Sequence, residues 1–426
     1  MPSKIIDNQS HEATKLSFIS VQIDPNYVDA ATQPTAFKRY PKFYRRFPLD
    51  LENPFHSFLY FTSAITSQKI YREGAYPLRV NPSAGALYPT EIYVQIRGIK
   101  GIIEGIYHLE IETKSLTLIY ELIDDGLEGY FLDNRIIKGC IFLVSCVYFR
   151  SSWKYKNRSL RYCFLDSGHH LGAIEASAYV QDYTTEIAFD FDWLALNEDL
   201  GFENKEFVTA ALISGNVKEK QIRRLRSPIP FVGGTDYFEP NRFVESGYKQ
   251  TLLPTNHQQE VLHPKFQFEK VKFLESIQKR RSARRFQQSE ISQEAFWTVW
   301  ESLNQPIATQ SDEAIEIYAA IQSVAGIEPG IYRGKDCLKS GNFREKMRYL
   351  CVNQAIARDS AVVFFLVSEF QNYRVALQLA GLLGQRVYLS ATYLGLGCSG
   401  IGAFFDDETQ AFLETKGSIL YAIAIG

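Results

Sequence analysis

The two halves of the chain carry the same motifs in the same order, and this repetition constrains the fold more than any other feature. The triplet Gly-Ile-Tyr occurs at 105–107 and again at 330–332. In each half an apolar run typical of a buried strand follows, and then a long stretch with helical periodicity. The apolar runs are 140–144 and 361–366, the helical stretches 162–179 and 374–394, and the closing strands 208–215 and 419–426. The sequence therefore predicts two copies of one α+β domain.

These motifs divide the 426 residues into four segments. Residues 1–36 are polar and aperiodic, which predicts a tail. The two repeats are expected at 37–216 and 268–426. Residues 217–267 are rich in Pro, Gly, Asn and charge, which predicts an irregular connector that wraps over the surface.

Composition argues against several classes of protein. The net charge is −2, so nothing at the level of the whole chain indicates nucleic acid binding. The longest apolar runs, such as 140–149, are too short to span a bilayer, and residues 1–4 do not lead into the apolar segment of a signal peptide. The six cysteines lack Cys-x-x-Cys spacing and nearby His pairs. We therefore expect no metal site, no membrane and a reducing cytoplasm.

A loop of small residues in the first half runs into an alternating apolar strand, expected at 91–96. The loop reads Asn-Pro-Ser-Ala-Gly-Ala-Leu-Tyr-Pro at 81–89 and is called the Pro-Ser loop below. Small side chains let backbone amides approach a planar ligand closely. The candidate binding residues in this loop are Pro82, Ser83, Ala84 and Gly85.

A basic cluster in the second half, Arg-Arg-Ser-Ala-Arg-Arg-Phe at 280–286, is expected to open a helical stretch. Arginine and serine donors suit a phosphate and a sugar-like chain, whereas a solvated helix face is the alternative. The candidate binding residues are Arg280, Arg281, Ser282 and Arg284. A second basic and aromatic segment, 38–46, is expected to pack on its own domain rather than on nucleic acid.

A glycine-rich segment lies near the end of the chain, at 395–402. Its glycines could end a helix and form turns, or they could present backbone donors to a ligand. The basic cluster upstream in the same repeat favours the ligand. The candidate residues are Gly397, Gly400, Ile401 and Gly402.

With these motifs the chain resembles the nitroreductase superfamily, specifically its SagB-type dehydrogenase branch, which contains FMN-dependent azoline oxidases. The matching stretches are 82–91, 105–108, 153–162, 165–169, 280–286 and 395–402. The resemblance implies a nitroreductase fold, FMN as cofactor, and oxidation of an azoline to an azole in a peptide-derived or amino-acid-derived substrate. It also implies a natural-product pathway, with a cyclodehydratase or other biosynthetic proteins as partners.

In ordinary members of this family, one subunit gives the basic cluster and the glycine-rich segment, and its twin gives the Pro-Ser loop. Here each half keeps only one of the two sets. The first half has neither an Arg-x-Ser-x-Arg motif at 62–67 nor a glycine at 183–190, and the second has no Pro-Ser loop between 308 and 317. These complementary losses predict a fused pseudo-dimer that holds one FMN and works as a monomer.

The same resemblance makes Lys154 and Tyr155 the candidate catalytic pair. A lysine taken out of water can lose its proton near neutral pH and serve as a base, and a neighbouring Tyr can relay a proton. The alternative is a basic surface formed with Lys156 and Arg158. Adjacent residues on a helix also diverge in direction, so the two need not reach one substrate.

Two other functions stay open at this point. An NAD(P)H-dependent nitro or quinone reductase would use the same cofactor without needing a dedicated base. A degenerate pseudo-dimer could instead bind flavin poorly and act as a scaffold in a biosynthetic complex, without catalysis.

Overall fold

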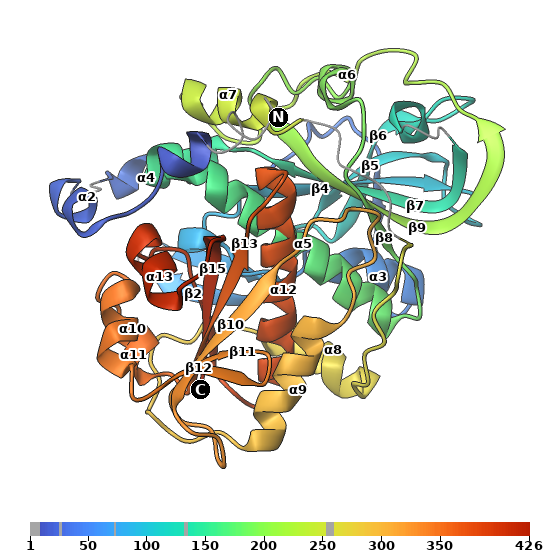
Figure 1. The fold of residues 1–426 in the computed structure, drawn as a ribbon. Helices are drawn as coiled ribbons and strands as arrows, with labels where there is room; N and C mark the ends of the chain where they lie inside the picture. Colours follow the sequence, from blue (N-terminus) through green and yellow to red (C-terminus); the bar gives the residue numbers. More distant parts are fainter. Residues whose placement is uncertain (1–8, 25–27, 72–73, 132–134, 253–259) are drawn as a thin grey trace. The chain divides into compact units, whose positions relative to one another are not determined.

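A computed structural model describes residues 9–24, 28–71, 74–131, 135–252 and 260–426 (Figure 1). The chain forms two compact units, and each is described by itself. Unit 1 contains Met1–Tyr27, Lys265–Gln305 and Glu313–Gly426, and unit 2 contains Val28–Pro264 and Pro306–Asp312.

Unit 2 is built on a seven-stranded sheet in the order β1-β6-β5-β4-β7-β9-β8, in which all neighbours are antiparallel. A separate hairpin, β2-β3, precedes β4. The strands are β1 (Arg46–Pro48), β2 (Ile65–Tyr71), β3 (Gly74–Arg79), β4 (Thr90–Arg97), β5 (Gly105–Glu110), β6 (Ser115–Glu121), β7 (Arg135–Cys146), β8 (Glu186–Ala188) and β9 (Phe207–Gln221).

Unit 1 is built on a six-stranded antiparallel sheet in the order β12-β11-β10-β13-β15-β14. This is the order of unit 2 without β1, strand for strand. The strands are β10 (Glu316–Ile321), β11 (Gly330–Arg333), β12 (Asp336–Ser340), β13 (Val362–Ser368), β14 (Cys398–Ile401) and β15 (Ser418–Ile425). The predicted repeat of one α+β domain is confirmed.

One long helix lies at the equivalent place in each repeat, α5 (Ser159–Val180) between β7 and β8 in the chain order of unit 2 and α12 (Tyr373–Tyr393) between β13 and β14 in that of unit 1. Both are buried along almost their whole length. The other helices of unit 2 are α3 (Pro54–Phe61), α4 (Phe149–Tyr155), α6 (Trp193–Asp199) and α7 (Arg242–Gln250). Those of unit 1 are α2 (Phe18–Ile23), α8 (Lys270–Lys279), α9 (Gln293–Asn304), α10 (Arg344–Leu350), α11 (Ala355–Asp359) and α13 (Asp406–Leu413). Among the described residues, none of these helices is both long enough and apolar enough to cross a membrane.

The expected polar tail is wrong where the structure describes it. His11 is buried, with its ring edge against Phe370 and Tyr373. The Leu16 amide donates to the Asp406 carboxylate at 2.8 Å, and Ser17 begins α2 with a capping box. These tertiary contacts compensate for the lack of any apolar period.

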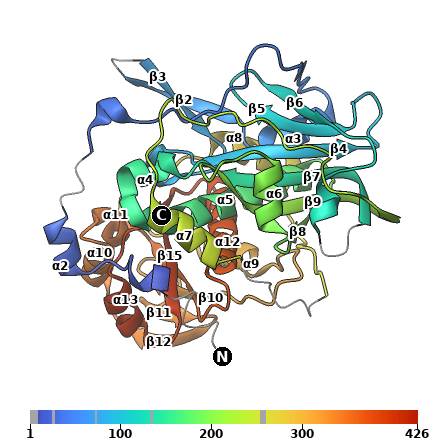
Figure 2. The same ribbon diagram turned by 90° about the horizontal axis from the view of Figure 1, so that it is seen from above.

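The expected connector is only partly irregular. Strand β9 continues past the predicted boundary at 216 and pairs with β7 as far as Gln221. Within the connector, α7 begins at the N-cap Asn241 and packs against α5 (Figure 2). The long β7 partner explains why the strand runs on, because each further residue gains ladder hydrogen bonds.

The basic cluster does not open a helix, contrary to the sequence analysis. Helix α8 ends at Lys279, Arg280 leaves the helical conformation, and the next helix begins only at Gln293. Ser282 instead forms an isolated parallel bridge with Cys398. Pairing with a distant strand determines this segment, rather than the helix propensity of its arginines.

Candidate functional site

The Pro-Ser loop lies in unit 2 between β3 and β4, and its backbone is tightly bent. Gly85, Ala86 and Tyr88 have φ angles of 64°, 56° and 47°. Left-handed backbone is costly for residues with a Cβ, and such residues cluster at functional sites. The loop therefore keeps this shape because other groups hold it.

Asp166 of α5 is one of those groups. The Ser83 hydroxyl donates to one carboxyl oxygen at 2.5 Å, and the Ala84 amide donates to the other at 3.3 Å. The Ser83 oxygen in turn accepts the Tyr88 amide at 2.9 Å, which closes the turn. The sequence analysis gave Asp166 no role. A carboxylate inside a helix buried along its length was the available signal, because such a group needs partners.

Lys154 and Tyr155 end α4 and converge on the Pro-Ser loop. A Cβ added at Gly85 would lie 2.7 Å from the Tyr155 hydroxyl and 3.5 Å from Lys154 Nζ. The Lys154 ammonium also lies 5.4 Å from the centre of the Tyr155 ring. Lys156 has φ 48° directly after the pair, so the helix stops there. The concern that adjacent side chains diverge does not apply to this pair.

Burial gives Tyr155 and Asp166 different proton affinities. It raises the pKa of Tyr155 well above its usual range, and the nearby Tyr162 and Asp166 add to this effect. Burial also raises the pKa of Asp166 to about 7, against the lowering effects of Ser83, Ala84 and Arg79. Tyr155 therefore keeps its proton at neutral pH, whereas Asp166 is close to half ionised.

Arg150 anchors helix α4 to the Pro-Ser loop. Its buried guanidinium lies 2.7 Å from the Glu91 carboxylate and donates to the Tyr88 carbonyl at 3.0 Å. It also donates to the Gly234 carbonyl in the connector at 2.6 Å. One buried charge thus holds the loop, the helix with the Lys-Tyr pair, and the connector in one arrangement.

In unit 1, Tyr388 of α12 brings the basic cluster and the glycine-rich segment together. Its hydroxyl lies 2.9 Å from the Ser282 hydroxyl and accepts the Gly400 amide at 2.6 Å. The guanidinium carbon of Arg280, which is buried, lies 5.2 Å from the centre of the same ring. Nothing in the sequence singled out Tyr388, because it is one aromatic among 25 tyrosines.

Two of the predicted glycines are required by close packing. A Cβ at Gly400 would lie 1.9 Å from the Tyr421 hydroxyl, and one at Gly397 would lie 2.9 Å from the Phe286 ring. Much of the glycine-rich segment is strand β14, not a loop. Gly395, with φ 77°, lies just after α12 as the turn alternative expects.

The remaining predicted residues of unit 1 differ in position. The Ile401 side chain belongs to the apolar core, and Gly402 directly follows β14. Arg281 donates to the Gln278 carbonyl at 3.3 Å. Arg284 is exposed, as the alternative of a solvated surface expects.

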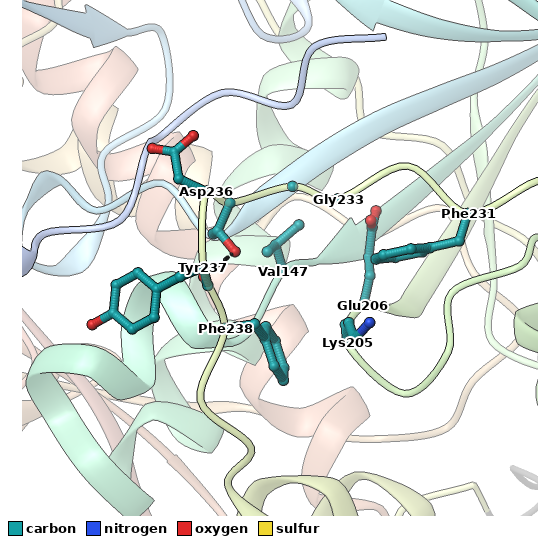
Figure 3. Close-up of a pocket in the computed structure, with 10 residues that line it drawn as sticks. Val147, Lys205, Glu206, Phe231, Gly233, Asp236, Tyr237 and Phe238 are labelled. Carbon is teal, nitrogen blue, oxygen red and sulfur yellow. Dashed lines mark hydrogen bonds between the residues drawn. The ribbon is translucent and has the colours of Figure 1, made fainter. Parts of the chain in front are cut away.

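A pocket of about 190 Å³ lies in unit 2 under the connector (Figure 3). Its walls are Val147, Lys205, Glu206, Phe231 and residues 233–238. Glu206, at one side of it, is paired with Lys38 at 2.7 Å and accepts the Tyr93 hydroxyl at 3.0 Å. None of the predicted site residues lines this pocket.

Comparisons with known proteins give the family of the second half. Residues 277–426 match the nitroreductase family, so this part of the chain is a nitroreductase-family domain. MJ1384, an inferred nitroreductase of Methanocaldococcus jannaschii, is 34% identical over 94 residues, which are 21% of this chain and 46% of that protein. The match thus spans about half the length of this curated relative.

A solved structure resembles the whole chain. The crystal structure of an inferred nitroreductase from Anabaena variabilis aligns with a TM-score of 0.82 and 26% identity, over 99% of this chain and 99% of that one. The fold is therefore the α+β nitroreductase fold, as predicted.

The nitroreductase family that residues 277–426 match is FMN-dependent, in agreement with the predicted cofactor. The residues of unit 1 fit such a group. Arg280 and Ser282 are donors suited to a phosphate and to ring carbonyls. A Cβ at Gly400 would clash with the Tyr421 hydroxyl, so glycine is needed there to make room for that side chain.

Proposed function

We propose that this chain, whose residues 277–426 form a nitroreductase-family domain, is an FMN-dependent dehydrogenase that oxidises an azoline to an azole in a peptide-derived or amino-acid-derived substrate. The observation that carries the proposal is the convergence of the Lys154 ammonium and the Tyr155 hydroxyl on Gly85 of the Pro-Ser loop. A basic surface patch has no reason to direct both groups at a strained loop.

The cofactor residues proposed here come from both halves of the sequence. They are Arg280 and Ser282 of unit 1 and, in unit 2, the Pro-Ser loop, as the complementary losses in the sequence imply. Bound FMN supplies a hydride acceptor. The protein residues position the substrate and move its proton.

Proton transfer in this proposal involves the Lys-Tyr pair. Tyr155 keeps its proton at neutral pH, so it acts as a donor that orients a substrate atom near Gly85. Lys154 is half-buried beside the same loop, and its neutral amine form would receive the proton that the substrate ring releases. The electron pair of the broken C–H bond leaves as hydride, and the proton leaves separately.

The test is single-turnover bleaching of bound flavin by an azoline-containing peptide. General acid–base help is worth about 10²–10⁴-fold, so Lys154→Ala and Tyr155→Phe should slow bleaching by at least about 100-fold with flavin content unchanged. Lys156→Ala, an exposed neighbour, is the matched control and should react at the wild-type rate. Equal bleaching by all four proteins would eliminate the pair.

A nitro or quinone reductase is the second candidate, because both proteins compared above are inferred nitroreductases. Such substrates accept hydride without a protein base. Under this alternative, NAD(P)H reduces the bound flavin, a quinone reoxidises it, and the Lys154→Ala variant turns over within about threefold of wild type, because no general base contributes. The azoline peptide would leave the flavin oxidised.

A further inference from the structure

The Pro-Ser loop is fastened at one end by a buried carboxyl group that no part of the proposed chemistry yet uses. Asp166 lies on α5, and its side chain receives two donors from consecutive residues, the Ser83 hydroxyl and the Ala84 amide. The next residue, Gly85, is the one that faces Lys154 and Tyr155. The carboxyl group is therefore one residue away from the point on which the pair converges.

We propose that Asp166 is a positioning residue of this site, whose ionised carboxylate holds the Ser83–Gly85 turn against the Lys-Tyr pair and whose protonation releases it. The link to catalysis rests on the proposed function. The link to the loop rests only on the hydrogen bonds.

The two donors fit an ionised partner best. A carboxylate only accepts, and its two oxygens match the Ser83 hydroxyl and the Ala84 amide without conflict. A proton on one oxygen competes with the Ser83 hydrogen, and a proton on the other removes the acceptor of the Ala84 amide. Ser83 cannot easily turn away, because its oxygen already accepts the Tyr88 amide.

The turn is also one that needs outside support. Gly85 tolerates its positive φ, but Ala86 and Tyr88 adopt theirs at a cost in backbone strain. The Ala86 carbonyl accepts the Tyr76 hydroxyl at 2.5 Å, so the far side of the turn is held by the β2-β3 hairpin. Asp166 holds the near side. Loss of the contact with Asp166 would release Ser83 and Ala84, which lead into Gly85.

The charges around Asp166 place its titration in the physiological range. Burial disfavours its ionised form, whereas Arg79 of β3 favours it. Tyr155 of α4 and Cys163 of α5 also interact with it electrostatically, and burial keeps both protonated. Because its pKa is raised to about 7, Asp166 changes charge near neutral pH, where Tyr155 and Cys163 stay protonated.

The first measurement needs no catalysis. In protein labelled with ¹⁵N-alanine, the Ala84 amide resonance should shift with a midpoint near pH 7 in the wild type and stay constant in Asp166→Asn. Ser83→Ala, which removes the other donor but keeps the carboxyl group, should retain the shift. Asp336→Asn, at an exposed carboxylate on β12, is the control and should behave as the wild type. An Ala84 resonance that ignores pH in the wild type would overturn the proposal.

The second measurement is the pH profile of flavin bleaching by the azoline peptide. The ionised fraction of a group with a pKa of 7 rises about tenfold between pH 6 and pH 8, and the wild-type rate should rise with it. Asp166→Asn should give a flat, slower profile, and Asp166→Glu should restore a pH-dependent one. A wild-type profile shared by Asp166→Asn would reject Asp166 while leaving the proposed function intact. No bleaching at any pH, with a titrating Ala84, would reject the proposed function and leave the loop contact standing.

Discussion

The sheets of the two units end at equivalent edges, β8 in unit 2 and β14 in unit 1, and these edges differ in what they can accept. Each lies beside the closing strand of its sheet and forms a parallel bridge with a passing segment. At β14 the segment is the basic cluster, where Ser282 faces Cys398. At β8 it is residues 306–312, where Thr309 faces Ile187 and the Ile187 amide donates to the Ala308 carbonyl at 2.7 Å.

The side chains at these edges point to different uses. Gly400 on β14 leaves room for the Tyr421 hydroxyl, and its amide donates to the Tyr388 hydroxyl. Strand β8 has no glycine, and Ile187, Ala308 and Thr309 are all buried there. Both edges are thus met by a segment of the chain itself, but only the segment at β14 carries arginines. We propose that the β14 edge binds a ligand and that the β8 edge does not.

The strongest way to break this comparison is to count cofactors. If the β8 edge is filled, the purified protein should release one FMN per chain on denaturation, measured by flavin absorbance against protein concentration. A value close to two FMN molecules per chain would mean that both edges bind the cofactor, which would contradict the proposed difference between β8 and β14.

The long helices extend the contrast, because α5 carries the buried Asp166 whereas α12 carries no carboxylate. The pKa of Asp166 is raised on folding, so its protonated form stabilises the fold below pH 4, and this stabilisation is lost as pH rises through about 7. A shift of this size corresponds to about 4 kcal/mol at most. Asp166→Asn should therefore unfold at higher urea than wild type at pH 8, with the advantage vanishing near pH 4.

A stability difference between Asp166→Asn and wild type that does not change with pH would contradict this expectation. Asp336→Asn, with its exposed carboxylate, supplies the baseline for the urea titrations. At neutral pH the ionised Asp166 is thus expected to lower the stability of the fold while it accepts the hydrogen bonds that shape the Pro-Ser loop. Such a cost in stability is common at functional sites.

Within the basic cluster, burial separates two arginines that the sequence treats alike. Arg280 is 3% exposed and faces Tyr388, whereas Arg284 is exposed. A charge-assisted hydrogen bond to a phosphate contributes about 1.5–3 kcal/mol, so Arg280→Ala should weaken FMN binding by about 10- to 100-fold. Arg284→Ala should change it by less than about threefold, since exposed charges contribute little. Fluorescence titration of the apoprotein with FMN measures the affinity of each variant. Equal losses of affinity would mean that Arg280 and Arg284 contribute alike to binding.

The repeated strands and helices could be predicted from the sequence because apolar runs and helical periodicity are local patterns. The runs at 140–144 and 361–366 lie in β7 and β13, and the helical stretches became α5 and α12. What it missed depends on partners far along the chain. Ser282 leaves a helical pattern to pair with Cys398, and Asp166 meets Ser83 across 83 residues. The roles of Lys154, Gly400 and the other site residues stay predictions, although the structure brings several of them together.

The smallest expected effect is at Tyr388, and it compares one tyrosine hydroxyl at the β14 edge with one in unit 2. Tyr388→Phe keeps the ring beside Arg280 but removes the partner of the Ser282 hydroxyl and of the Gly400 amide. Tyr107→Phe removes a single hydrogen bond, to the Ile103 carbonyl at 2.6 Å. Each lost bond costs about 0.5–1.5 kcal/mol, so both variants should fold, with Tyr388→Phe losing more stability. Only Tyr388→Phe should also weaken FMN binding, by about tenfold, because it alone loosens the segments that we propose as cofactor-binding. Calorimetric unfolding and flavin titration of the two variants measure these effects separately. If both lose stability and neither loses affinity, Tyr388 supports the fold of unit 1 and not its ligand edge.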